Sequence, residues 1–199
     1  MRMHSKPVAL TMMFLTSLAT AWAQAAGPQA AAIDPAVLAK ANGGDAAAQM
    51  QMGDNSCATG GGVQLSARQL ADCNKTAAAW YRKAAEQGSL PGQLRLAAVY
   101  RDGKGVQRDM QQAAVWYRKA AEQGDATAQA TLGVLYNMGQ GVPQSYPDAY
   151  YWFDLAARVK GPNQEKYATY RQMSGEHITA DELAEVQERV DKWLAAHPR

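Results

Sequence analysis

A nine-residue stretch that recurs at a fixed distance is the feature that most constrains the fold of this chain. The sequence Trp-Tyr-Arg-Lys-Ala-Ala-Glu-Gln-Gly occupies positions 80–88 and returns unchanged at positions 116–124. A degraded third copy begins at position 152, so Trp80, Trp116 and Trp152 follow one another at intervals of 36 residues. A period of roughly 20 to 50 residues is typical of repeats that stack, because one such unit cannot bury its apolar face alone. The tryptophans are therefore predicted to fill the space between neighbouring helices of an all-α solenoid.

Glycine and capping residues divide each repeat into two helices. A glycine that can end one helix stands directly before an aspartate or serine that can cap the next, at positions 44–45, 88–89 and 124–125. In the first helix of the third repeat, Leu132 and Tyr136 belong to one apolar stripe, which marks the side that faces the core. A Gly-x-Gly-Val turn follows, and a second helix that carries the tryptophan completes the repeat. The first helices are predicted at residues 46–55, 90–102 and 126–138.

The segments outside the repeats are assigned from their composition. Basic residues, an apolar run and Ala-Trp-Ala at 21–23 predict a secretory signal peptide that is cut after Ala23, or after Ala25 as the second choice, with a retained anchor as the alternative. Near the other end, Thr179 opens a capping box before an amphipathic helix, which is typical of the closing cap of a repeat array. The predicted organisation is a signal peptide at 1–23, a disordered leader at 24–33, a partial repeat helix at 34–43, repeats at 44–87, 88–123 and 124–160, and capping helices at 161–199.

The first repeat differs from the other two because additional residues separate its two helices. From Gly53 to Trp80 there are 27 residues, whereas the equivalent distance in each of the other repeats is 19. The extra residues are expected in the loop between the helices, with Cys57 and Cys73 on either side of it. In an exported protein this pair is expected to form a disulfide worth about 3 kcal/mol in the chain-entropy model, with two buried free thiols as the alternative. The loop is interpreted as a structural insertion, with a recognition element as the alternative.

These motifs together resemble the Sel-1-like repeat family, whose members are relatives of the tetratricopeptide repeats. The resemblance rests on Leu-Gly-x-x-Tyr-x-x-Gly-x-Gly-Val within 128–142 and on Trp-Tyr-x-Lys-Ala-Ala within 109–124, and it covers roughly residues 44–160. It implies a right-handed superhelix of about three antiparallel helix pairs that serves as a binding scaffold. Exported bacterial members of the family are usually adaptors or regulators of other proteins. The chain departs from the pattern in its enlarged first repeat, at Ala97 and at Leu155, and these departures leave the expected fold unchanged.

The sequence contains no constellation typical of an enzyme or of a metal site. No cluster of His, Cys and Asp has the spacing of metal ligands, and neither a nucleophile elbow nor a Ser-x-x-Lys motif occurs. Without Arg2 and Lys6 of the signal peptide, the 20 basic residues fall to 18 and equal the acidic ones, which argues against nucleic acid or an anionic membrane as partner. We therefore expect no catalytic activity, no metal and no cofactor. Some cysteine-rich relatives are described as penicillin-binding or weak β-lactamases, so binding or hydrolysis of a β-lactam or peptidoglycan fragment is the alternative function.

A surface for a protein or peptide partner is therefore expected on the first helices, which commonly line the concave side of a solenoid. Candidates for contact with the partner are the polar residues outside the apolar stripe. Three glutamines among them share one repeat position and would form a ladder, for which bridging of adjacent helices is the equal alternative. The partner-binding candidates are Gln49, Gln93, Arg95, Arg101, Gln129 and Asn137. The sequence thus predicts a periplasmic or secreted scaffold that binds a protein or peptide on its concave face, with a purely structural spacer as a further possibility.

Overall fold

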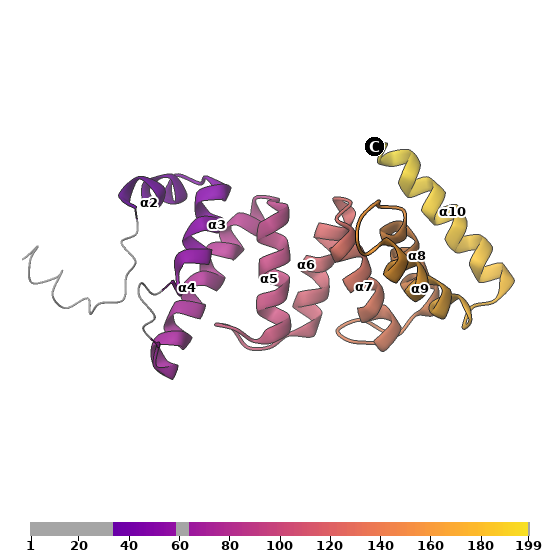
Figure 1. The fold of residues 1–199 in the computed structure, drawn as a ribbon, viewed down its shortest axis with the longest axis horizontal. Coiled ribbons are helices and arrows are strands. Elements are labelled where there is room, and N and C mark those ends of the chain that lie inside the picture. Colours follow the sequence, from indigo (N-terminus) through magenta and orange to yellow (C-terminus); the bar gives the residue numbers. More distant parts are fainter. Residues whose placement is uncertain (1–33, 59–63, 199) are drawn as a thin grey trace, which may run out of the picture.

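The computed structural model describes residues 34–58 and 64–198 and shows an elongated array of helices (Figure 1). These residues form nine α-helices and no strand, which confirms the predicted all-α class. The predicted signal peptide and leader lie outside the described residues, as does the centre of the loop in the first repeat.

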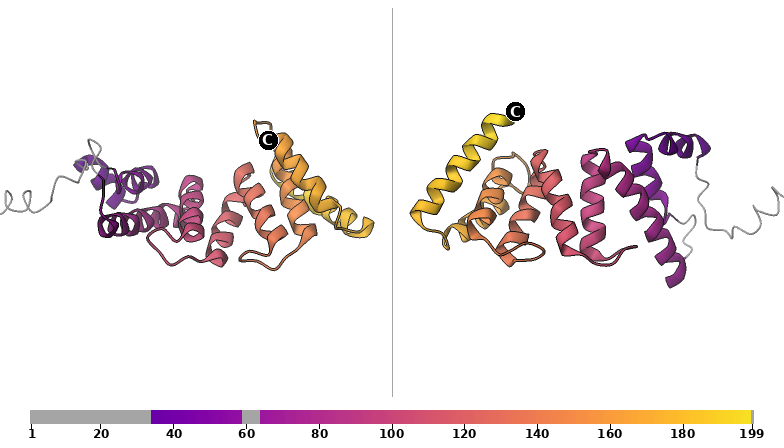
Figure 2. Two further views of the ribbon diagram at one scale, coloured as in Figure 1. Left: turned by 60° about the horizontal axis from the view of Figure 1, so that its bottom comes forward. Right: turned by 180° about the vertical axis from the view of Figure 1, so that it is seen from behind.

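Six of the helices form three consecutive pairs that stack along the long axis of the molecule (Figures 1 and 2). The pairs are α3 (Ala46–Asn55) with α4 (Ala67–Glu86), α5 (Leu90–Asp102) with α6 (Met110–Glu122), and α7 (Ala126–Met138) with α8 (Tyr146–Ala157). The short α2 (Pro35–Asn42) precedes them, and α9 (Gln164–Gly175) and α10 (Ala180–Ala196) follow. The last helix, α10, lies diagonally across the C-terminal end of the array and contacts α8 (Figure 1).

The ends of the helices follow from local side-chain chemistry. Asp45, Ser89 and Asp125 each accept a hydrogen bond from the amide three residues further on, which satisfies one free donor in the first turn of α3, α5 and α7. Thr179 and Glu182 form the expected capping box at the start of α10. The first helix of every repeat therefore begins where the capping pattern predicts.

The Gly-x-Gly-Val turns hold consecutive repeats close together. Gly103 and Gly139 end α5 and α7 in the left-handed conformation, with φ of 71° and 64°. Gly105 and Gly141, with φ of 78° and 72°, lie directly against the backbone of the second helix of the preceding repeat, where a Cβ atom has no room. The second glycine of the turn is therefore required both for its backbone conformation and for this close approach.

The core runs through all three repeats as layers of alanine between larger side chains. Leu132, Tyr136, Trp116 and Trp152 are buried in it, as the repeat pattern predicts for them. Trp80 is only half-buried, and it packs against the small apolar cluster of α2 and α3 at the N-terminal end of the array.

The insertion in the first repeat lengthens its second helix as well as its loop, whereas we expected all of the additional residues in the loop; the connection at 56–66 is longer than its counterpart at 103–109. Helix α4 has 20 residues and its counterpart α6 has 13, and the extra turns of α4 start behind a capping box at Ser66. Cys73 therefore lies inside α4. The expected disulfide to Cys57 is present, with 5.3 Å between the two Cα atoms, and it ties these extra turns to the end of α3.

Candidate functional site

The glutamines predicted as partner contacts lie in the interior, and in this respect the prediction is wrong. Gln49, Gln93 and Gln129 are only 3%, 4% and 0% exposed. The Oε1 atom of Gln49 accepts a hydrogen bond of 2.7 Å from Nε2 of Gln87, and Oε1 of Gln93 accepts one of 2.8 Å from Nε2 of Gln123. The ladder thus bridges adjacent helices, and its buried amides are out of reach of a partner.

The third repeat breaks this ladder. The position that corresponds to Gln87 and Gln123 is occupied by Val159, whose side chain has no donor. In agreement with this, Nε2 of Gln129 donates to the carbonyl of Ala121 at 3.1 Å, but among the described residues its buried Oε1 has no partner. The regular bridging therefore ends where the array passes into its C-terminal cap.

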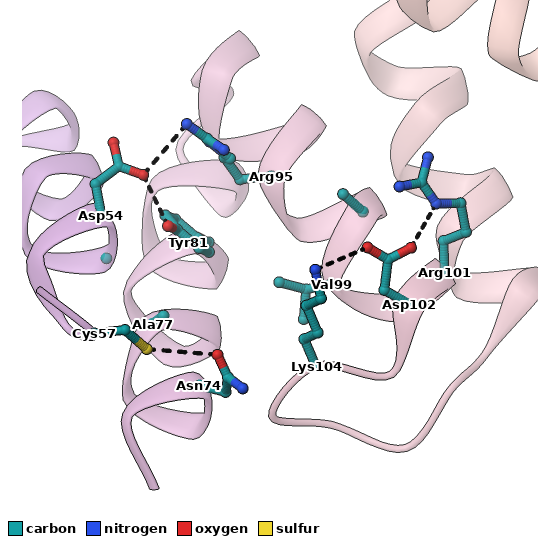
Figure 3. A pocket seen from close by; sticks show the side chains of 12 residues that line it. Asp54, Cys57, Asn74, Ala77, Tyr81, Arg95, Val99, Arg101, Asp102 and Lys104 are labelled. Carbon is teal, nitrogen blue, oxygen red and sulfur yellow. Dashed lines mark hydrogen bonds and ion pairs between the residues drawn. The ribbon is translucent and has the colours of Figure 1, made fainter. Parts of the chain in front are cut away.

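Two of the predicted contact residues, Arg95 and Arg101, line one open pocket between α3, α4 and α5 (Figure 3). Its volume is about 410 Å³. The first helix α3 contributes Asp54, α4 contributes Tyr81, and the end of α5 with the following turn contributes Asp102 and Lys104. We call these residues the charged pocket: Asp54, Tyr81, Arg95, Arg101, Asp102 and Lys104. The sixth candidate, Asn137, lies outside it.

On one side of the charged pocket, Asp54 holds both Tyr81 and Arg95 (Figure 3). Its Oδ1 atom accepts a hydrogen bond of 2.8 Å from the Tyr81 hydroxyl and lies 3.5 Å from a terminal nitrogen of Arg95. Burial, together with the hydrogen bond to this carboxylate, raises the pKa of Tyr81 to about 12. The side chains of Arg95 and Asp54 are 59% and 46% exposed, and an ion pair so open to water contributes at most about 1 kcal/mol. Arg95 is therefore free to exchange this contact for a carboxylate of a ligand.

On the other side, Asp102 is shared by two cations. It accepts a hydrogen bond of 2.7 Å from Nε of Arg101 and lies 3.5 Å from Nζ of Lys104. The hydrogen bond from Arg101 lowers the pKa of Asp102, so this carboxyl is ionised at neutral pH. Arg101 also donates to the hydroxyl of Tyr117 at 3.1 Å, which fixes its orientation. The charged pocket thus holds three cations and two carboxylates, and its surplus positive charge is complementary to an acidic group.

Four residues of the charged pocket were not predicted as contact residues: Asp54, Tyr81, Asp102 and Lys104. Asp54 belongs to no motif, because its partners Tyr81 and Arg95 are distant in the sequence, and Tyr81 was considered only as part of the repeated stretch. Lys104 was read only as part of the glycine turn. The Arg-Asp-x-Lys cluster at 101–104 was the one visible signal, since charges so close in sequence at a helix end tend to share a surface.

The charged pocket supplies exposed ion pairs and hydrogen-bond donors, and the sulfur atom that lines it belongs to Cys57, which is in the disulfide. Over residues 34–58 and 64–198, no group of three or more His, Cys, Asp and Glu side chains is arranged to hold a metal ion. No helix within those same ranges has the length and apolar character needed to cross a membrane.

The repeats match a known family model, that of the Sel1 repeat, at residues 46–89, 90–125 and 126–158, which is more than half of the chain. The chain belongs to the Sel1 repeat family. Sel1 repeats generally mediate protein–protein interaction, and their proteins are typically non-enzymatic scaffolds. A search of curated proteins found no match.

Solved structures of similar proteins share the solenoid fold. A protective antigen present in uropathogenic Escherichia coli strains, which displays an SLR fold, is 28% identical over 78% of this chain, with a TM-score of 0.55. The present chain spans only 39% of that protein. A Sel1 repeat protein from Oxalobacter formigenes is 30% identical, with a TM-score of 0.53, and the match covers 65% of this chain and 92% of that protein. Helicobacter pylori cysteine-rich protein B is 23% identical over 67% of this chain and 92% of its own length, with a TM-score of 0.47.

Proposed function

We propose that this Sel1-repeat protein is an interaction scaffold of the cell envelope that binds a peptide segment of a protein partner on its first-helix face. The first-helix face is the surface formed by α3, α5 and α7, and we take it as the concave side of the array because first helices commonly line that side of a solenoid. The observation that carries the proposal is the charged pocket on this surface. The arginines of this pocket make weak, exposed ion pairs. A carboxylate of the partner that accepts two parallel hydrogen bonds from one guanidinium would bind more strongly than these existing partners.

The proposed location outside the cytoplasm is supported by two features. The apolar stretch before Ala23 has the pattern of a secretory signal, and the disulfide between Cys57 and Cys73 is of a kind that persists in oxidising compartments. Cell fractionation followed by mass measurement tests this: the proposal predicts a periplasmic or secreted protein that begins at Gln24. An intact N-terminus in the cytoplasmic fraction would contradict it.

An enzymatic function on the same pocket is disfavoured by the state of its reactive groups. The thiol of Cys57 is oxidised, and the raised pKa of Tyr81 keeps its phenol protonated at neutral pH. Hydrolysis of a β-lactam or peptidoglycan fragment would need an activated nucleophile, which neither of these groups provides.

Site-specific photo-crosslinking in living cells tests the proposed binding surface. A photoreactive benzoylphenylalanine replaces Ala98, which lines the charged pocket, or Val115, which is exposed on the second helix α6. We expect a crosslinked partner from position 98 and none from position 115. The same adduct from both positions, or from position 115 alone, would show that the first-helix face is not the binding surface.

Charge-reversed variants add a second criterion to this experiment. Arg95→Glu with Lys104→Glu removes the surplus positive charge, and both side chains are exposed enough for the fold to tolerate the change. Lys40→Glu with Lys160→Glu makes the same change in net charge at exposed positions outside the pocket. The adduct should disappear in the first variant and persist in the second.

A further inference from the structure

The first-helix face carries a second pocket towards its C-terminal end, and this pocket is apolar. It lies between α7, α8 and α9 and has a volume of about 220 Å³. Phe153 and Tyr170 pack against each other there with 5.4 Å between ring centroids. Met138 and Met173 also line it and remain 58% and 55% exposed. We call this the methionine pocket, and its residues are Val134, Asn137, Met138, Phe153, Tyr170 and Met173.

The methionine pocket occupies the same place in its repeat as the charged pocket does two helix pairs earlier. Each second-helix aromatic ring contributes to its own pocket, Tyr81 to the charged one and Phe153 to the apolar one. The charged residues of α5 and its following turn can also be compared with their counterparts in α7 and its turn, and all of these counterparts are uncharged. The changes over 36 residues are Arg95 to Thr131, Arg101 to Asn137, Asp102 to Met138, and Lys104 to Gln140.

The size and exposure of the methionine pocket fit one or two side chains of a partner. Pockets for drug-sized molecules usually measure about 300–1,000 Å³, and this one is smaller. Methionine is flexible and polarisable, so two methionines at the rim can adapt to an aliphatic group of variable shape. Both methionines are more than half exposed, so a partner that binds here can bury their apolar surface.

We propose that one extended segment of the partner protein spans both pockets, with a large aliphatic side chain in the methionine pocket and an acidic group beside Arg95, Arg101 and Lys104. The change from surplus positive charge to apolar surface along one face supplies the complementarity that selects such a segment. This inference rests on the proposed function, since it names the chemistry of the peptide that the first-helix face recognises.

The test uses random octapeptides displayed on phage and selected against the exported full-length protein. Selection is repeated on Met138→Gln with Met173→Gln, which keeps side-chain length but makes the pocket polar, and on Arg95→Glu with Lys104→Glu. Leu70→Gln, at an exposed apolar residue of α4, is the matched control for the methionine variant.

We expect wild-type selections enriched in both acidic residues and Leu, Ile or Met. The affinity of the best synthetic peptide should fall about tenfold to a hundredfold in the methionine variant, because one large apolar side chain loses its burial, and should be unchanged in the Leu70→Gln control. The variant of Arg95 and Lys104 should lose only the acidic preference. In methyl NMR, the ε-methyl signals of Met138 and Met173 should shift with the peptide, while that of Met52, which is buried in the apolar cluster at the N-terminal end, stays in place.

Two failures are distinguishable. Peptides that bind with acidic enrichment alone, and with equal affinity to the methionine variant, would overturn the inference and leave the proposed function standing. If no peptide is selected by the wild-type protein, the proposed peptide-binding function itself is wrong, and the inference falls with it.

Discussion

Replacing Gln123 by methionine removes the donor that joins the end of α6 to two neighbouring elements. Its Nε2 atom donates to the carbonyl of Gly88 at 3.1 Å and to Oε1 of Gln93 at 2.8 Å. Methionine has nearly the same length and volume, so packing is preserved. The Oε1 atom of Gln93, whose side chain is almost fully buried, would keep no donor, and a buried acceptor without a partner costs about 1–3 kcal/mol.

For a domain of this size, each 1 kcal/mol lowers the melting temperature by about 2–4 °C, so a decrease of about 2–12 °C is expected. Scanning calorimetry of the purified protein measures it. Gln111→Met is the matched control, because Gln111 is exposed on the same helix and its replacement should change stability by less than about 0.5 kcal/mol. If the two variants melt at the same temperature, the glutamine ladder does not stabilise the array, and its burial has another cause.

Three further predictions concern other parts of the array. The Cys57→Ser, Cys73→Ser protein should lose about 3 kcal/mol of unfolding free energy in urea titrations, and a reductant should lower wild-type stability to the same level while leaving the variant unchanged. Because the pKa of Tyr81 is raised from 10.0 to about 12, the folded state holds this proton more tightly than the unfolded state; its contribution to stability is complete below pH 10 and lost as the pH rises towards 12. In urea titrations between pH 10 and pH 12, the midpoint of unfolding should decrease less in Tyr81→Phe than in the wild type. An equal decrease in both proteins would contradict the raised pKa of Tyr81. Gly141→Ala should destabilise the protein by more than about 1 kcal/mol, since φ is 72° and the neighbouring backbone leaves no room, whereas Gly161→Ala, which meets no atom within 4 Å, should melt like the wild type.

The stacking of helix pairs could be predicted from the sequence because several independent signals agree. The 36-residue period, the caps at Asp45, Ser89 and Asp125, and the glycine turns all specify the same helix ends. A fold can be predicted from its sequence when the local signals for helix ends and turns agree with the pattern of the whole repeat. The extra residues of the first repeat were misplaced because only their number was considered, although Ser66 and Gln69 form a capping box that starts a helix there.

The binding surface was harder to predict than the fold. On a helix, neighbouring residues point about 100° apart, so a polar residue beside the apolar stripe can face either the next repeat or the solvent. Gln93 faces the next helix and is buried, whereas Arg95, two positions on, is open to solvent. The pairing of Tyr81 with Asp54 joins residues 27 apart in the chain, and only the three-dimensional packing of α3 on α4 brings them together.

The most direct test of the central claim is the affinity of the crosslinked partner for the Arg95→Glu, Lys104→Glu protein, measured beside the Lys40→Glu, Lys160→Glu protein. Both variants change the net charge equally, so a general electrostatic effect would weaken both. We expect the affinity to fall at least about tenfold in the first variant and to stay near the wild-type value in the second. Equal affinities for the two variants would contradict the assignment of the charged pocket as the site that binds the partner.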